Sequence, residues 1–215
     1  EAIRPLGVQI LLNDPPQKEA LRKAGKPHEF FLKMEELQEK CDIISFHTPL
    51  ITKGPYPTFH LANKTFFNAL KKQPIIINTS RGAVVDNTDV LQALKDGIIR
   101  DAIIDTWENE PNINQELLNL IYIGTPHIAG YSADGKANAT RMALTALCNH
   151  FHLPVTFQIR VPQLPEEELP ESNLTETERA LVLYNPHTDS LKLKSHPTMF
   201  EELRGNYPLR REFIE

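Results

Sequence analysis

The sequence predicts an α/β protein with a doubly wound parallel sheet, followed by a small α+β domain at the C-terminal end. Short apolar runs recur along residues 8–123. Segments of about 15 to 30 residues with helix signals separate these runs, as the crossovers between parallel strands require. The composition changes beyond residue 152, where prolines become frequent.

Five apolar runs are predicted to be strands. They are rich in isoleucine, mostly lack alternation with polar residues, and are bounded by polar residues or glycine. This pattern is typical of strands that are buried on both faces of a parallel sheet. The predicted strands are Val8–Leu12, Ile43–Phe46, Ile75–Ile77, Ala102–Ile104 and Ile121–Ile123.

Helix signals lie between and after these strands. Asn63 and Asn87 are positioned to cap helices whose apolar residues follow at helical spacing. A short helix is predicted around Leu117, and a longer one from Ala133 to about His152.

The chain beyond residue 152 is predicted to hold a linker and a few short elements. Residues 154–170 contain four prolines and an acidic run, a composition that favours a linker over a binding peptide. Val155–Val161 alternates apolar and polar residues, which predicts one edge strand. Farther on, Thr175 and Glu178 form a capping-box pattern, and a second helix is predicted over Met199–Arg204.

The sizes of these parts predict a division into two domains. Residues 1–152 are expected to form the first domain, and residues 153–215 the linker and a C-terminal dimerisation domain. About 45 residues follow the linker, too few to bury much core independently. A second copy of the chain is the simplest partner for them, so we expect a homodimer.

Charge and cysteine content exclude several functional classes. Twenty-three Lys and Arg against 28 Asp and Glu give a formal net charge of −5, without a long basic block. This argues against nucleic acid or an acidic membrane surface as the main partner. No run approaches the roughly 18 apolar residues that span a bilayer, and no signal peptide is recognised. The two cysteines cannot form a disulfide scaffold, so we expect a cytoplasmic protein.

The N-terminal residues resemble the second half of a dinucleotide-binding unit. No GxGxxG motif occurs in the chain, yet residues 2–7 read as the tail of a helix, with Gly7 as its cap. The following predicted strand ends at Asp14, where a carboxylate would bind the adenosine ribose hydroxyls and repel the 2′-phosphate of NADP. We therefore expect NAD as cofactor and a chain that begins within the first crossover helix.

Polar groups follow each later strand at its carboxyl end, the edge at which open parallel sheets bind ligands. A lone Arg, Glu or His there is most often a surface residue, but Arg81, Glu110 and His127 follow three successive strands. The motifs are His47-Thr48-Pro49, Asn78-Thr79-Ser80-Arg81-Gly82-Ala83-Val84-Val85-Asp86, Asp105-Thr106-Trp107-Glu108-Asn109-Glu110-Pro111 and Thr125-Pro126-His127-Ile128-Ala129-Gly130-Tyr131.

The last three motifs resemble the signatures of the D-2-hydroxyacid dehydrogenases, over residues 1 to about 152. The resemblance implies a Rossmann-type NAD-binding domain that here lacks its first strand and glycine-rich turn. It also implies that His127 is the general base, that Glu110 orients and stabilises its ring, and that Arg81 holds the substrate carboxylate. These three side chains should converge around one carbon beside the nicotinamide ring.

Further contacts come from the same resemblance. Tyr131 and Arg81 would touch the substrate, and we expect no metal site. The residues that would contact NAD are Asp14, Thr48, Thr79, Ser80, Arg81, Asp105 and Gly130.

Other motifs resemble a branch of the family that acts on a phosphorylated hydroxy acid. They are Asp14-Pro15-Pro16, Gly54-Pro55, His60-Leu61 and Gly135-Lys136. Lys136 is one candidate for the substrate phosphate, and an ordinary solvated lysine is the simpler reading. We expect the 215 residues alone to have little activity.

Two other functions remain open at this point. The chain could belong to a dehydrogenase for phosphoglycerate or glycerate, or to a corepressor on the same fold that senses NAD without turnover. A metal site at Cys148, His150 and His152 is rejected, because only Cys148 and His152 share a helix face.

Overall fold

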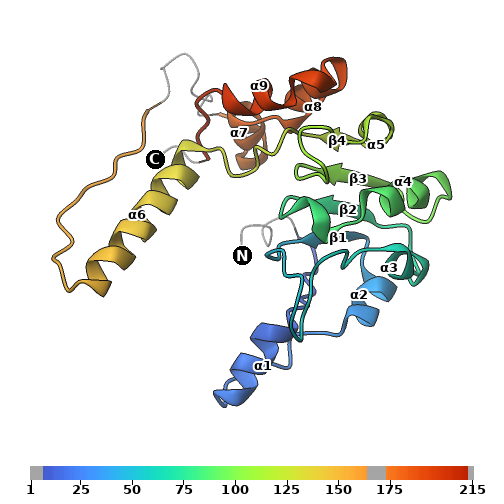
Figure 1. The fold of residues 1–215 in the computed structure, drawn as a ribbon, viewed down its shortest axis with the longest axis horizontal. Helices are drawn as coiled ribbons and strands as arrows, with labels where there is room; N and C mark the ends of the chain where they lie inside the picture. The colour runs from blue at the N-terminus through green and yellow to red at the C-terminus, as the bar shows by residue number, and fades with distance from the viewer. Residues whose placement is uncertain (1–6, 164–172, 213–215) are drawn as a thin grey trace. The chain divides into compact units, whose positions relative to one another are not determined.

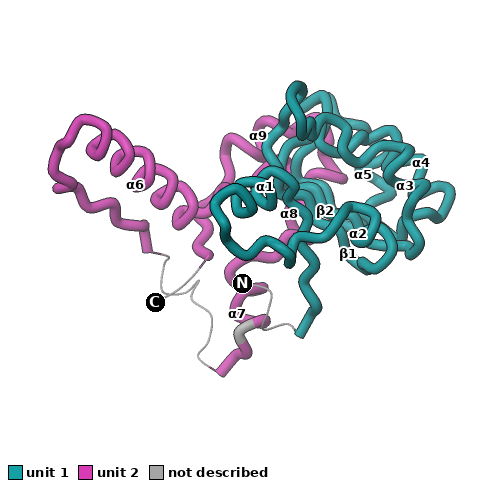
Figure 2. The backbone as a smooth tube through the Cα atoms, turned by 90° about the horizontal axis from the view of Figure 1, so that it is seen from below, with its two compact units in different colours: residues 1–124 teal, residues 125–215 magenta. Residues whose placement is uncertain are grey.

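The computed structural model describes residues 7–163 and 173–212 (Figure 1). The chain forms two compact units, residues 1–124 (unit 1) and residues 125–215 (unit 2), and each is described by itself (Figure 2). The units divide after Gly124, and the domain boundary expected after residue 152 stays a prediction.

A four-stranded parallel sheet forms the centre of unit 1 (Figure 1). Its strands pair in chain order, β1 with β2, β2 with β3 and β3 with β4. Four of the five predicted strands and the parallel α/β class are thereby confirmed. The bounds are β1 Ile43–Phe46, β2 Ile75–Asn78, β3 Asp101–Ile104 and β4 Ile123–Gly124.

Burial alternates along the first three strands of unit 1. Ile44, Ile76 and Ile104 point into the core, whereas Ile43, which precedes Ile44 in β1 and faces the opposite side of the sheet, is 54% exposed. The apolar runs predicted strands that are buried on both faces of the sheet. For unit 1 by itself this prediction is wrong, because only one face of these strands is fully buried. Because the strands follow chain order and crossovers are right-handed, the connecting helices gather on one face (Figure 1). They are α3 (Lys64–Asn68), α4 (Asn87–Lys95) and α5 (Gln115–Leu120).

The connecting helices confirm the predicted helix signals, except that one N-cap lies one residue earlier than predicted. The Asn63 side chain accepts hydrogen bonds from Thr65 N and Phe66 N and caps α3. The cap of α4 is Asp86 rather than Asn87, because the Asp86 carboxylate accepts from the first free backbone amides of the helix.

The segment before β1 departs from the prediction. Val8–Leu12 is not a strand, and only Leu12 forms a single parallel bridge, to Phe31. Val8 and Leu12 are about half exposed, so this run gains little burial from strand formation. The sequence signals did not predict helices α1, Pro15–Lys23, and α2, Met34–Lys40. The helix tail expected over residues 2–6 lies outside the described residues.

Every regular element in the described residues of unit 2 is a helix. The expected edge strand Val155–Val161 is wrong, because no strand of residues 125–163 or 173–212 lies beside it to share a ladder. Residues 164–170 of the expected linker lie outside the described part. The helices are α6 Ala133–His150, α7 Glu176–Leu183, α8 Pro186–Ser195 and α9 Phe200–Gly205, with a 3₁₀ turn at Pro197–Met199. Across residues 7–163 and 173–212, no helix is both long and apolar enough to cross a bilayer.

Candidate active site

The turn that carries Arg81 is fixed by a buried amide at the end of β2. Asn78 Nδ2 donates to Arg81 O at 3.1 Å and lies 3.5 Å from Thr106 O. Asn78 Oδ1 accepts from Ser80 N and from Ser80 Oγ, at 3.2 and 2.9 Å. A buried amide that satisfies several partners resists displacement, so Thr79, Ser80 and Arg81 leave the sheet in one defined direction.

Arg81 itself is exposed, which leaves its guanidinium accessible to a ligand. Its Nη1 donates to Ser80 O at 2.6 Å, a contact that holds the side chain back along its own turn. The planar guanidinium is suited to bind a carboxylate through two parallel hydrogen bonds.

The loop after β3 carries Glu110 and lies directly against the Arg81 turn. A Cβ atom added at Gly82 would lie 1.8 Å from Trp107 O, so only glycine permits this approach. Glu110 Oε1 accepts a hydrogen bond from Trp107 N at 2.8 Å. The structure therefore brings the two loops that carry Arg81 and Glu110 together within unit 1.

Two buried hydroxyl groups near these strand ends have no hydrogen-bond partner among residues 7–163 and 173–212. They are Thr48 Oγ1, beyond β1, and Thr106 Oγ1, beyond β3. An unpaired buried polar atom costs free energy unless a ligand or water satisfies it. Thr48 was expected to contact NAD, and its orphaned hydroxyl fits a polar group of that cofactor. Asp105, the residue before Thr106, is 3% exposed and lies at the same edge of the sheet.

Asp14 caps a helix in the structure. Its Oδ1 accepts from Gln17 N at 2.9 Å at the start of α1. One carboxylate oxygen can cap the helix while the other accepts from a ribose hydroxyl, so the contact expected with NAD stays a prediction.

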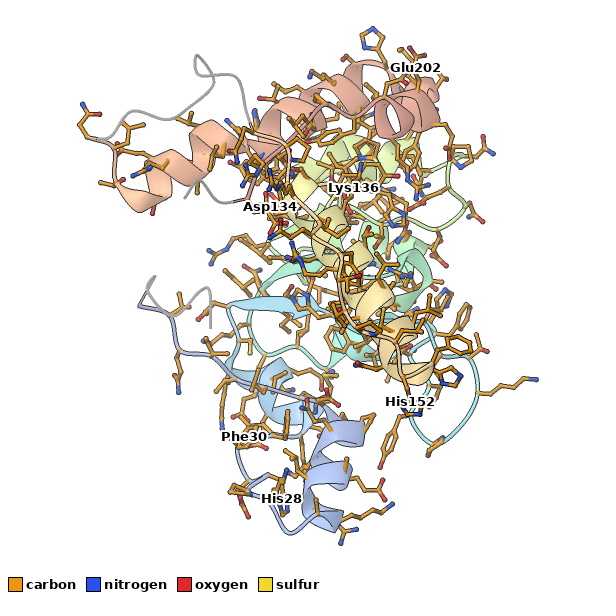
Figure 3. All side chains as sticks on the ribbon, turned by 90° about the vertical axis from the view of Figure 1, so that its left-hand side faces the viewer. His28, Phe30, Asp134, Lys136, His152 and Glu202 are labelled. Carbon is orange, nitrogen blue, oxygen red and sulfur yellow. The ribbon has the colours of Figure 1, made fainter. Side chains whose placement is uncertain are left out.

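His127, Gly130 and Tyr131 belong to unit 2 and precede α6. His127 adopts a left-handed backbone conformation, with φ of 56°. Lys136 Nζ lies 4.5 Å from the centre of the Tyr131 ring, a cation–π contact near the start of α6. Figure 3 labels Lys136 there.

The C-terminal residues hold the segment that carries His127. Arg210 is 6% exposed, and its Nη2 donates to Ala129 O at 2.9 Å. Arg211 Nε lies 3.2 and 3.0 Å from the two carboxylate oxygens of Asp134, in the first turn of α6 (Figure 3). Glu212 N also donates to Asp134. Burial alone would raise the pKa of Asp134, but the hydrogen bonds from Arg211 and Glu212 outweigh it and lower that pKa.

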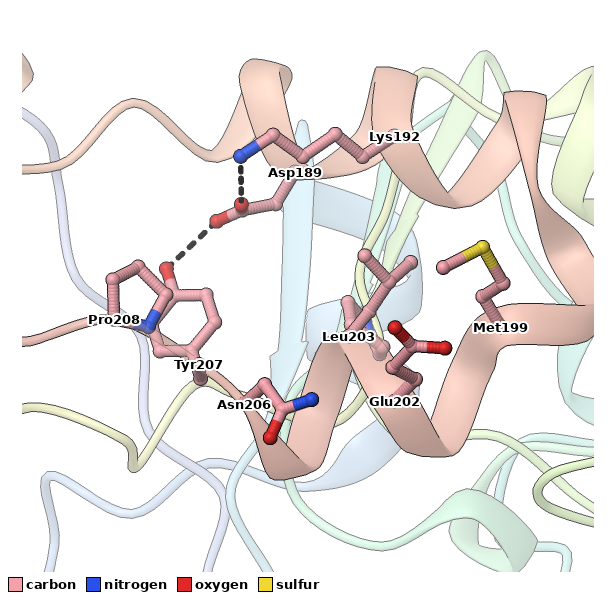
Figure 4. A pocket seen from close by; sticks show the side chains of 9 residues that line it. Asp189, Lys192, Met199, Glu202, Leu203, Asn206, Tyr207 and Pro208 are labelled. Carbon is pink, nitrogen blue, oxygen red and sulfur yellow. Dashed lines mark hydrogen bonds and ion pairs between the residues drawn. The ribbon is translucent and has the colours of Figure 1, made fainter.

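A small pocket of about 170 Å³ lies between α8, α9 and the residues that follow α9 (Figure 4). Tyr207 Oη donates to Asp189 Oδ2 at 2.7 Å, and Lys192 Nζ lies 4.0 Å from Asp189 Oδ1. Burial, together with this hydrogen bond, raises the pKa of the Tyr207 phenol far above its usual value. Tyr207 therefore stays protonated at neutral pH and ties α8 to the residues that follow α9.

The structure brings together two of the loops that carry expected site residues. The loops of Arg81 and Glu110 meet within unit 1, whereas His127 belongs to unit 2, so the convergence of the three side chains stays a prediction. Sequence reasoning gave no site role to Asn78, Thr106 or Arg210. Asn78 and Thr106 stand inside the quoted motifs at strand ends, a signal that could have singled them out.

A family model and several curated proteins match this chain. The sequence profile described as "D-isomer specific 2-hydroxyacid dehydrogenase, NAD binding domain" matches residues 1–129. The erythronate-4-phosphate dehydrogenase of Bacteroides thetaiotaomicron is 53% identical over 206 residues, which are 96% of this chain and 57% of that protein. Its namesake from Porphyromonas gingivalis is 41% identical over 213 residues, covering 96% of this chain and 56% of that protein. The chain thus spans somewhat more than half the length of these curated relatives.

Solved structures show the same fold. D-lactate dehydrogenase from Aquifex aeolicus, complexed with NAD and lactic acid, has a TM-score of 0.52 and 26% identity. That match covers 68% of this chain and 46% of the other. The apo form of Rhodotorula graminis D-mandelate dehydrogenase has a TM-score of 0.51 and 26% identity, covering 72% and 44%. The chain therefore belongs to the D-isomer specific 2-hydroxyacid dehydrogenase family, and its residues 1–129 belong to the family's NAD-binding domain.

Proposed function

We propose that the protein containing this chain oxidises 4-phospho-D-erythronate with NAD, giving 3-hydroxy-2-oxo-4-phosphooxybutanoate and NADH, in the synthesis of pyridoxal phosphate (vitamin B6). The observation that carries this proposal is the 53% identity, over 96% of the chain, to a protein named erythronate-4-phosphate dehydrogenase. The paired loops of Arg81 and Glu110 support it, because the reaction needs a cation for the substrate carboxylate and an acidic partner for the base.

The proposed roles follow from the chemistry of a 2-hydroxy acid. Oxidation removes the hydroxyl proton and a hydride from the same carbon. His127 accepts the proton as general base and becomes cationic. Glu110 hydrogen-bonds the other ring nitrogen and stabilises that cation, and Arg81 binds the carboxylate and polarises the developing carbonyl.

NAD, when bound, accepts the hydride. The residues proposed to hold it are Asp14, Thr48, Thr79, Ser80, Arg81, Asp105 and Gly130. The orphaned hydroxyl of Thr48 supports this assignment, because a hydroxyl or amide of the cofactor would satisfy it.

Tyr131 is proposed to contact the substrate. Lys136 lies against the Tyr131 ring, which supports Lys136 as a donor to the substrate phosphate. An ammonium group is a suitable phosphate ligand, as a point charge without the geometric demands of a guanidinium.

We also propose that the protein is a cytoplasmic homodimer. Helix α6 supports the dimer, because no residue beyond Ala137 in it is buried. Leu147 and Phe151, four residues apart at the end of α6, share one helix face and are 51% and 61% exposed. A helix gains most of its stability from packing an apolar face, which a second copy would supply here.

The test is a substrate panel with the full-length protein that the gene encodes. NADH formation is followed by absorbance with 4-phospho-D-erythronate, 3-phosphoglycerate and glycerate as substrates. The proposal expects the highest kcat/KM for 4-phospho-D-erythronate. A higher value for either other acid would reassign the substrate, and NAD binding without turnover of any acid would favour the corepressor.

A further inference from the structure

Three side chains outside the proposed catalytic set form a linear cluster in unit 1. His60 Nε2 lies 2.7 Å from Glu108 Oε1, and His60 Nδ1 lies 3.1 Å from Asp86 Oδ2. The His60 side chain is 27% exposed, and each carboxylate 20%. These contacts are therefore partly shielded from water, unlike most surface ion pairs.

The imidazole lies between two carboxylates. Each ring nitrogen faces a carboxylate oxygen, and an N–H on that nitrogen would donate to it. The backbone of His60 is left-handed, with φ of 47°, and the ring stacks on Phe59 at 3.9 Å between centroids. A non-glycine residue adopts this conformation at a cost in free energy, which the surrounding contacts must offset.

The two carboxylates belong to the two loops of the proposed site. Asp86 lies at the end of the segment that begins with Arg81, and it caps α4. Glu108 lies two residues before Glu110. His60 therefore bridges the Arg81 segment and the Glu110 loop through its side chain.

Backbone contacts extend this bridge. His60 N donates to Ala83 O at 2.8 Å. Glu108 Oε2 accepts from Asn87 N at 2.8 Å, and Asn87 Oδ1 accepts from Glu108 N at 3.1 Å. The three segments are thus joined by charged and neutral hydrogen bonds that depend on one another.

We propose that His60 is a positioning residue for the dehydrogenation: by pairing with Asp86 and Glu108, it fixes the loop of Arg81 against the loop of Glu110. This inference rests on the proposed function, in which Arg81 and Glu110 act on one substrate. A displacement of about 1 Å in such groups can lower a rate by about a hundredfold.

The test compares His60→Gln, Glu108→Gln and the double variant in the full-length protein. Gln keeps a hydrogen-bonding side chain but cannot carry a charge. His152→Gln is the matched control, because His152 has φ of 53° and lies just beyond the end of α6 (Figure 3). Two properties are measured for each variant: steady-state kinetics, and hydrogen exchange of peptides covering residues 82–87 and 106–110.

The proposal expects His60→Gln to lower kcat about tenfold to a hundredfold, with the KM for NAD changed by less than about twofold. Exchange in both peptides should accelerate about tenfold, because the contacts between His60 and the two carboxylates, which hold both loops, would be weakened. The double variant should lose no more than the larger single loss. His152→Gln should match the wild type in both measurements.

Unchanged exchange in both His60→Gln and Glu108→Gln would overturn the proposal. Faster exchange with wild-type kcat would also overturn it, since the bridge would then be structural only. If the wild type turns over no hydroxy acid, the proposed function fails, and the exchange measurement still decides whether His60 joins the two loops.

Discussion

The loops of unit 1 and the His127 segment of unit 2 are held in different ways. In unit 1, the loops of Arg81 and Glu110 are joined by Asn78 and by the packing of Gly82 on Trp107. His60, which is 48 residues before its partner Glu108, joins them as well. In unit 2, the segment after His127 is held by arginines 77 to 82 residues farther along the chain.

The two units therefore differ in whether the residues that hold the site belong to the same motifs as the proposed catalytic residues. In unit 1, most of the residues that hold the loops lie within the motifs of Arg81 and Glu110. The same motifs therefore encode the proposed catalytic residues and the contacts that position them. The ties in unit 2 come from the far end of the chain, so the His127 segment depends on residues that have no proposed role in the reaction.

The largest effect is expected for the proposed base. His127→Asn should lower kcat by about 10²- to 10⁴-fold in the full-length protein, because no other group is proposed to accept the hydroxyl proton. Asparagine tolerates the left-handed backbone at this position, so the melting temperature should hardly change. Kinetics and thermal unfolding check this prediction together. A kcat near that of the wild type would remove His127 as the base.

The next largest effect tests the close approach in unit 1. Gly82→Ala should destabilise the protein by about 3 kcal/mol, since its Cβ would collide with the backbone of Trp107 rather than with a flexible side chain. Gly205→Ala is the control, because a Cβ there meets nothing within 4 Å. Urea unfolding measures both. Equal stability of the two variants would show that the loops do not need this contact.

A smaller effect, dependent on pH, is expected in unit 2. Arg211→Leu should cost about 2 to 3 kcal/mol at neutral pH, because it leaves the partly buried Asp134 carboxylate without its cation. The lowered pKa of Asp134 adds stability above the usual aspartate range, and this stability is lost as the pH falls through the lowered pKa.

Unfolding free energies measured from about pH 6 to about pH 3 should therefore converge for the wild type and Arg211→Leu on the acid side. A difference that stays constant over this range would exclude the Asp134 pair as its cause.

The smallest effect concerns the link between α8 and the residues after α9. Tyr207→Phe should cost about 1 kcal/mol, the contribution of one hydrogen bond, here to Asp189. Asp189→Asn should cost no more than this, since the amide oxygen can still accept. Thermal unfolding checks both variants, and a Tyr207→Phe protein as stable as the wild type would show that this bond contributes nothing.

Much of the fold follows from local sequence signals. The isoleucine runs predicted β1 to β4, and Asn63 and Thr175 predicted helix caps that the structure confirms. Val8–Leu12 and Val155–Val161 carry a strand pattern too, but a strand forms only where a neighbour pairs with it, and pairing is not a local property.

The candidate site, like the fold, could be predicted only where the signal is local in the sequence. Arg81 and Glu110 stand in recognisable motifs, and their loops do come together in the structure. His60 was noticed only as part of a resemblance, because its partners Asp86 and Glu108 are 26 and 48 residues away and no spacing rule connects them. Contacts of this kind depend on tertiary packing, which the sequence pattern does not display.

The most direct test is a crystal structure of the full-length protein with NAD and 4-phospho-D-erythronate bound. The account predicts a hydrogen bond between a Glu110 carboxylate oxygen and one ring nitrogen of His127, with the other ring nitrogen on the substrate hydroxyl and Arg81 on the substrate carboxylate. A structure in which the His127 ring faces away from both Glu110 and the substrate would contradict it.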